Sequence, residues 1–207
     1  MRLRMMTMGL ALGACWALAA GCTLSVGSMT AGAQMMKMDG PMKMGATSPA
    51  KALDDLLGVY EHDAMGVVKA MPADKYSFAP TPAIFAPGQG VKFDTVRTFV
   101  QEVTHVAEAN YYFYSSVGGM KPDVDTKALA NITTKDEAVA ALAASFRFAH
   151  RAIATITPEN AFLPIKPIDG QGTRATLAAF GVAHGYDHYG QMVEYLRMNG
   201  IVPPGSK

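Results

Sequence analysis

The chain has 207 residues, of which 50% are hydrophobic and only 17% are charged, and its formal net charge is +1. This length suffices for one domain with a substantial hydrophobic core. Leaving out Arg2 and Arg4, which precede a long uncharged run, 16 of the 18 basic residues face 17 acidic ones, a net charge of −1. Because no basic stripe is available to hold a phosphate backbone, the composition disfavours nucleic acid as a partner.

The N-terminus has the pattern of an export signal. Arg2 and Arg4 come before an apolar stretch, Met8–Gly21, and the small-residue motif Ala31-Gly32-Ala33 follows. A short basic region, an apolar region and a small-residue cleavage site are typical of a secretory signal. The sequence therefore predicts a signal peptide over residues 1–33 and a mature protein that is exported, either periplasmic or secreted.

The same leader supports two other interpretations. The run Ala19-Ala20-Gly21-Cys22 resembles a lipoprotein box, and lipid attachment at Cys22 would anchor the chain to a membrane. An uncleaved anchor is the third interpretation. Cys15 and Cys22 are the two cysteines of the chain and both lie in the leader. The mature domain is therefore expected to have no disulfide and no thiol nucleophile.

Residues 34–49 are predicted to form a Met-rich flexible linker between the leader and the domain. Five methionines fall between Met35 and Met44, among Lys, Gly and Pro. This composition lacks the residues that build a core, which favours a linker. Thioether sulfurs are soft ligands, so a Cu(I) site in this segment is the competing hypothesis.

The remaining residues, 50–207, are predicted to form one all-α domain. Four segments have apolar residues at helical spacing and helix-capping residues at their ends: from Pro49 to just before Pro72, from Asp94 as N-cap to Ser116, from Thr134 to about Ile156, and from Thr173 to Asn199. The stretches 71–90 and 158–173 are predicted to be loops, and no run is predicted to be a strand. Four long helical patterns favour a four-helix bundle.

Three histidines are candidate ligands for one metal ion. His184 and His188 are four residues apart in the last predicted helix, which puts them on one face with Cβ atoms roughly 5–6 Å apart. Two imidazoles so arranged can bind one ion at roughly 2.0–2.1 Å, but a third ligand must come from another element. His105 in the second predicted helix is the best candidate. At about 100° per residue, however, His105 points away from the main apolar stripe of that helix.

Other polar residues have weaker claims to the same site. Glu108 follows His105 by one turn in the second predicted helix and is a candidate to support a ligand, although a solvated charge is the favoured interpretation. Gln191 and Tyr195 share the histidine face of the last helix, and lining the site and helix packing are equal alternatives for them. His62 and His150 have charged neighbours, so both are expected on solvated faces.

These motifs resemble those of the DinB/YfiT-like superfamily of four-helix metal proteins. The similarity lies in FAPTPAIFAPGQGVKFDTVRTFVQEVTHVAEANYYF and in HGYDHYGQMVEYLRMNGIVPP, and it extends from about Ala50 to Pro204. The resemblance implies a bundle in which one histidine of the second helix and an HxxxH motif of the last helix bind one divalent metal. The matching residues are His105, His184 and His188.

The resemblance also implies a class of chemistry. Members with activities are thiol-dependent transferases and isomerases, in which the metal lowers the pKa of a thiol and the thiolate attacks an electrophile. Three neutral imidazoles leave coordination positions open, which is compatible with hydrolysis as well. Zn²⁺, Ni²⁺, Fe²⁺ and Mn²⁺ are all candidates, because affinity order does not settle occupancy in the cell.

We therefore expect an exported, metal-dependent transferase or hydrolase acting on a small molecule that the sequence does not identify. The alternative is a non-catalytic protein that binds a metal or a small ligand. A homodimer is left open.

Overall fold

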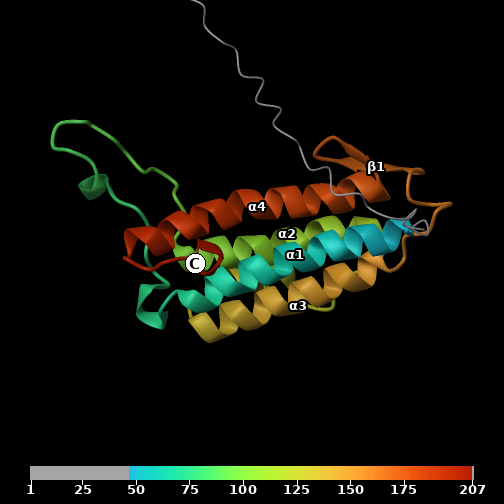
Figure 1. Ribbon diagram of the computed structural model, residues 1–207, viewed down its shortest axis with the longest axis horizontal. Coiled ribbons are helices and arrows are strands. Elements are labelled where there is room, and N and C mark those ends of the chain that lie inside the picture. Colours follow the sequence, from blue (N-terminus) through green and yellow to red (C-terminus); the bar gives the residue numbers. More distant parts are fainter. Residues whose placement is uncertain (1–46, 207) are drawn as a thin grey trace, which may run out of the picture. The chain divides into compact units, whose positions relative to one another are not determined.

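The computed structural model describes residues 47–206, so the predicted signal peptide and most of the Met-rich segment lie outside the described residues. Four long α-helices form the domain: α1 (Pro49–Ala70), α2 (Phe99–Gly118), α3 (Lys135–Ile153) and α4 (Arg174–Met198) (Figure 1). Between residues 47 and 206, no helix has both the length and the apolar character needed to cross a membrane.

Side-chain caps determine where the helices begin. The Ser48 and Thr134 hydroxyls accept hydrogen bonds from the first turns of α1 and α3, and Thr98 and Thr173 form capping boxes on α2 and α4. These bonds satisfy N–H groups that the first helical turn leaves unpaired. The predicted N-cap of the second helix, Asp94, was wrong, because the reciprocal bonds of the Thr98 capping box start α2 four residues later.

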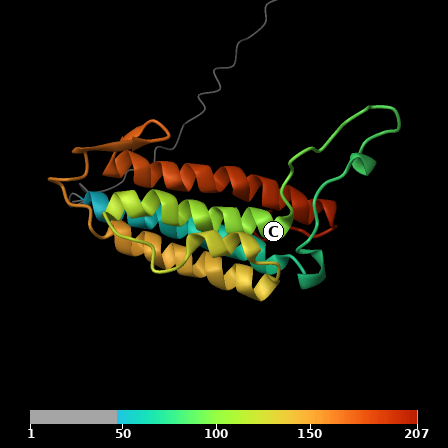
Figure 2. The same cartoon turned by 180° about the vertical axis from the view of Figure 1, so that it is seen from behind.

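The helices are arranged so that elements distant in sequence become neighbours. Helices α1 and α4 run in one direction, and α2 and α3 run in the other (Figures 1 and 2). This order requires a long return connection after α2, which contains a 3-10 helix (Thr126–Asn131) that lies against α2. Helix α2 packs between α3 and α4, and α1 packs between the same two. The second and last helices therefore share an interface.

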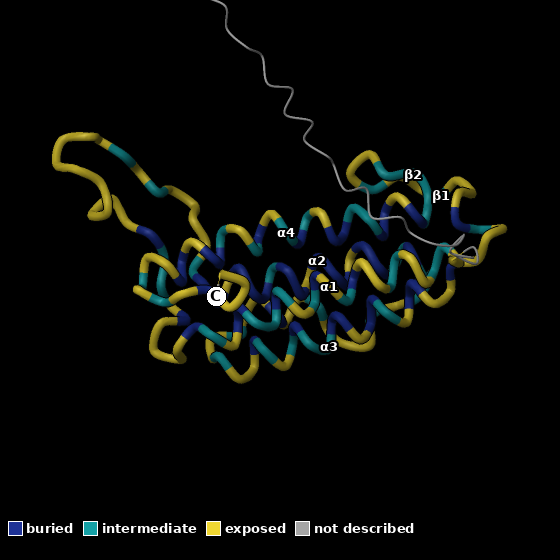
Figure 3. Tube along the Cα trace, in the orientation of Figure 1, coloured by how far each residue is buried: buried dark blue, intermediate teal, exposed yellow. Residues whose placement is uncertain are grey.

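Helix α2 is buried on more than one side, which resolves the difficulty with His105. Val103 and Ala107 of the predicted stripe are fully buried, and Ala109 and Phe113 on the side of His105 are buried as well. Figure 3 shows buried residues along the inner faces of all four helices. His105 lies outside the main stripe and still faces another helix, because α2 contacts both α3 and α4.

A β-hairpin precedes α4, where the sequence analysis predicted no strand. Strands β1 (Pro164–Ile168) and β2 (Gln171–Thr173) pair antiparallel. Asp169 and Gly170 turn the chain between them with φ angles of 47° and 78°. Asp-Gly is a favoured pair for a two-residue turn of this kind, because both positions need positive φ. Both strands are short and β1 contains two prolines, which concealed this signal, so the domain is a helical bundle with one added hairpin.

Candidate metal centre

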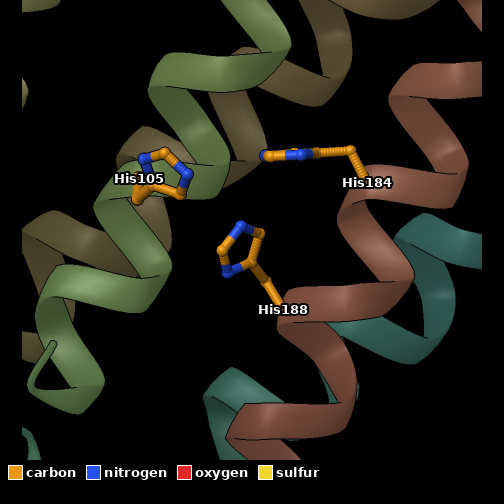
Figure 4. A group of neighbouring side chains, drawn as sticks. All are labelled: His105, His184 and His188. Atoms are coloured by element: carbon orange, nitrogen blue, oxygen red, sulfur yellow. The ribbon is translucent and has the colours of Figure 1, made fainter. Parts of the chain in front are cut away.

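Three histidine side chains from two neighbouring helices point toward one another (Figure 4). His105 comes from α2, and His184 and His188 come from α4. Each offers a ring nitrogen that lies within 4.8 Å of the other two. The ring centroid of His188 lies 4.6 Å from that of His105 and 4.7 Å from that of His184. The structure thus brings together all three residues that the sequence singled out as ligands.

Two glycines beside the histidines let α4 pack closely against its neighbours. A Cβ atom on Gly185 would lie 2.2 Å from the Tyr60 ring, and one on Gly181 would lie 2.9 Å from the Tyr114 hydroxyl. That hydroxyl donates a hydrogen bond to the carbonyl of Ala178 at 3.0 Å. Aromatic rings from α1 and α2 therefore sit directly on the α4 backbone. This contact fixes the rotation of α4 about its axis and hence the face that carries the histidines.

Glu102 forms a hydrogen bond with one of the three histidines, His188. Its Oε2 atom lies 2.7 Å from Nδ1 of His188, and both residues are buried, with exposed fractions of 1% and 5%. A carboxylate can only accept a hydrogen bond, so His188 donates from Nδ1 and its Nε2 keeps a free lone pair. Metal-ligating histidines commonly donate their second nitrogen to a carboxylate in this way, which fixes the tautomer and the ring orientation.

Glu102 was not among the residues selected from the sequence, where Glu108 was the candidate carboxylate and a solvated charge was its favoured role. Glu108 is exposed, whereas Glu102 lies one turn before His105 on the buried side of α2. The spacing Glu-x-x-His, which carboxylate-rich metal bundles use, is present at residues 102–105 and was the available signal.

The lowered pKa values of His105 and His184 favour neutral imidazole, the form of histidine that binds metals. The pKa of His105 is lowered to about 4, first by burial and then by the positive charge of Arg97 and the neighbouring histidines. Burial also lowers the pKa of His184, and His188 adds to the effect. Neutral imidazole is the ligand form of histidine. His105 and His184 can therefore present lone pairs without first losing protons at neutral pH.

One buried nitrogen in this group lacks a partner. Nε2 of His184 is shielded from solvent and makes no hydrogen bond within residues 47–206. Buried polar atoms are usually paired, so each exception requires an explanation. Together with the three convergent nitrogens and the Glu102 contact, this atom makes the donor set fit a divalent ion that accepts imidazole ligands.

Comparison with protein families agrees with this geometry. The sequence model of the DinB superfamily matches residues 60–192, which is more than half of the chain and includes all three histidines. The chain belongs to the DinB superfamily. No curated protein is significantly similar to it.

The other candidates of the sequence analysis make contacts elsewhere in this DinB-superfamily bundle. Gln191 donates a hydrogen bond to Asp187 on the same helix, and the Tyr195 hydroxyl donates to the carbonyl of Arg97. Both residues therefore stabilise α4 and its contacts. His62 is exposed on α1, as expected.

His150 is less solvated than expected, because it lies between α1 and α3 in contact with two carboxylates. Its Nδ1 lies 2.5 Å from Asp54 Oδ1 and its Nε2 lies 3.0 Å from Glu61 Oε2. Burial lowers the pKa of His150, but the two hydrogen bonds and the two negative charges outweigh it, so the pKa is raised above its ordinary value. Both ring nitrogens are occupied, which leaves no lone pair for a metal.

A pocket opens from the metal centre along α2. Its volume is about 590 Å³, and His105 and His184 form part of its wall. Tyr112 and Phe113 from α2 and Asp169 from the hairpin turn line it as well. This volume falls within the range of roughly 300–1,000 Å³ typical of small-molecule sites. Two of the three histidines therefore border a space that a small molecule can enter.

Proposed function

We propose that this DinB-superfamily protein is a divalent-metal-dependent enzyme, a transferase or a hydrolase, that acts on a small molecule outside the cytoplasm. The observation that carries the proposal is that His105 and His184 both form part of the wall of one pocket of about 590 Å³. A closed structural metal site usually has four protein ligands and no such opening.

The protein residues have separable tasks in this proposal. His105, His184 and His188 would hold the metal, which would act as a Lewis acid and lower the pKa of a bound water or thiol. Glu102 keeps His188 in one tautomer and one orientation through its 2.7 Å contact with Nδ1. Phe113 is 3% exposed and its ring centroid lies 5.3 Å from that of His184, so it limits the access of water to that ligand.

Spectroscopy of the Co²⁺-substituted protein tests whether the metal is open to exchange. Azide or a small thiol should perturb the d–d bands of the wild-type protein, because three protein ligands leave positions free. A panel of esters, and of electrophiles offered with a thiol, should then reveal turnover that His188→Ala abolishes and His62→Ala retains. Unchanged spectra together with no turnover would instead support a non-catalytic metal-binding protein.

The proposed location outside the cytoplasm rests on the leader sequence. Mass spectrometry of the mature chain should find Gln34 as the N-terminal residue if cleavage follows Ala33. A lipid-modified Cys22 would support the membrane-anchored alternative. An intact Met1 on protein recovered from the cytoplasm would contradict export.

A further inference from the structure

The pocket beside the metal centre contains two carboxylates that have no cationic partner. Glu108 of α2 and Asp169 of the hairpin turn both line it. Neither forms an ion pair within residues 47–206. No lysine or arginine is among the residues of the pocket wall. Arg97 lines a neighbouring hollow whose wall also includes His105 and Glu108, but its ion-pair partner is Glu102. Asp169 and Glu108 therefore give the pocket wall a negative charge.

The hairpin turn is what brings Asp169 to this wall. Asp169 has a φ of 47°, a left-handed conformation that Asp tolerates better than most residues. Strands β1 and β2 place the turn just before the N-terminal end of α4, the helix that also carries His184.

Aromatic rings complete the same wall. Tyr112 is 57% exposed although it is a large aromatic residue, and it lines the pocket together with Phe113. Their ring centroids are 5.4 Å apart with an interplanar angle of 55°, so they present differently inclined surfaces. Aromatic faces attract organic cations, and quaternary ammonium groups are recognised by such rings combined with carboxylates.

We propose that the pocket binds a small organic cation, that is, a molecule with an ammonium group on an apolar body. The charged group is bound by Asp169 and Glu108, and the apolar body lies against Tyr112 and Phe113. This inference rests on the proposed function, because it names the substrate class of the same site. It also separates this chain from one that takes an anionic thiol, which two unpaired carboxylates would repel.

Benzyltrimethylammonium is a suitable probe because it is a permanent cation with no donor atom for a metal. Its dissociation constant is compared with those of phenylacetate and benzyl alcohol by ligand-observed NMR on the Co²⁺-loaded full chain. The cation should bind roughly tenfold more tightly than phenylacetate, and its protons should show paramagnetic broadening from the neighbouring Co²⁺. Asp169→Asn and Glu108→Gln should each weaken cation binding by roughly three- to fivefold, since both carboxylates are exposed.

Asp187→Asn is the matched control. Asp187 is exposed on α4 beside His188 in the sequence and carries the same charge as Asp169, but it does not line the pocket. If Asp169 acts by contact, Asp187→Asn should leave cation binding unchanged. Equal losses in both variants, tighter binding of phenylacetate, or no cation binding to the metal-loaded protein would each overturn the inference.

The measured Co²⁺ content distinguishes a failure of the organic-cation inference from a failure of the proposed metal-dependent function. If the wild-type chain retains no Co²⁺, the proposed enzyme is wrong, and the cation preference is then measured on the metal-free protein with the same three variants. If Co²⁺ is bound and exchangeable but anions bind better, the metal-dependent function stands and the organic-cation inference is wrong.

Discussion

Two histidine sites in this bundle have opposite electrostatic surroundings. At the α2–α4 interface, burial and neighbouring positive charge lower the pKa of His105 to about 4. At the α1–α3 interface, Asp54 and Glu61 raise the pKa of His150. The α2–α4 site keeps the His105 imidazole neutral with a lone pair available. The α1–α3 site favours the charged form of His150, whose two ring nitrogens both contact carboxylates. The partners across the interface, and not the residue type, determine whether a histidine can bind a metal.

Substitution of one of the three convergent histidines should have the largest effect on the difference between the two sites. Alanine at His105, His184 or His188 should each abolish stoichiometric metal binding, because two imidazoles cannot replace three convergent ones. Elemental analysis after dialysis measures the metal content. His62→Ala and His150→Ala are the controls and should retain one metal per chain. A fully occupied His105→Ala protein would exclude the three-histidine site.

Weakening the hydrogen bond between His188 and Glu102 should have the next largest effect. Glu102→Gln keeps a hydrogen-bond acceptor but removes the negative charge, so metal affinity should fall roughly tenfold, at the low end of the range for such partners. Competition with a chromophoric chelator measures the affinity. Glu108→Gln removes a carboxylate from the same helix without touching a ligand and should leave the affinity unchanged. The reverse ranking of the two variants would return the supporting role to Glu108.

The packing that orients α4 can be tested without metal. Gly185→Ala would introduce a Cβ 2.2 Å from the Tyr60 ring, and overpacking of this kind costs about 1–3 kcal/mol. Gly190→Ala, on the same helix with no atom within 4 Å of the added Cβ, should stabilise the protein by about 0.5–1 kcal/mol through helix propensity. Denaturant unfolding of the metal-free protein measures both. Equal effects would show that Tyr60 does not constrain α4.

The His150 site should produce the smallest effect, visible as a dependence of stability on pH. Its folded pKa lies above the ordinary value of 6.5. The charged form is therefore favoured by folding, and its contribution is fully present below about pH 6.5 and is lost as pH rises through the folded pKa. Because the group is partly exposed, wild type should exceed His150→Gln by at most about 1 kcal/mol at low pH.

The measurement for His150 is the difference in unfolding free energy between wild type and His150→Gln at several pH values. That difference should shrink as pH rises. His62→Gln is the control, because His62 is exposed and forms no ion pair with a carboxylate within residues 47–206. A His150 difference that grows with rising pH would contradict the raised pKa.

Local sequence signals determined most of the helices and two of the three histidines of the candidate metal centre. Ser48, Thr134 and Thr173 were identifiable as caps, because a cap bonds to a backbone N–H within three residues. His184 and His188 were identifiable as a pair, because a helix places residues four apart on one face. These relations involve a single turn of chain, so they depend little on the rest of the protein.

Tertiary structure decided which side chains meet across helices. The apolar stripe of α2 gave the wrong direction for His105, because that helix is buried against two neighbours at once. Glu102 and His188 are paired across 86 residues, and Asp169 reaches the pocket through a hairpin that the sequence analysis missed. Sequence spacing fixes angles within one helix, but only packing fixes the rotation of one helix against another. The supporting carboxylate and the charge of the pocket therefore became visible only in the folded bundle.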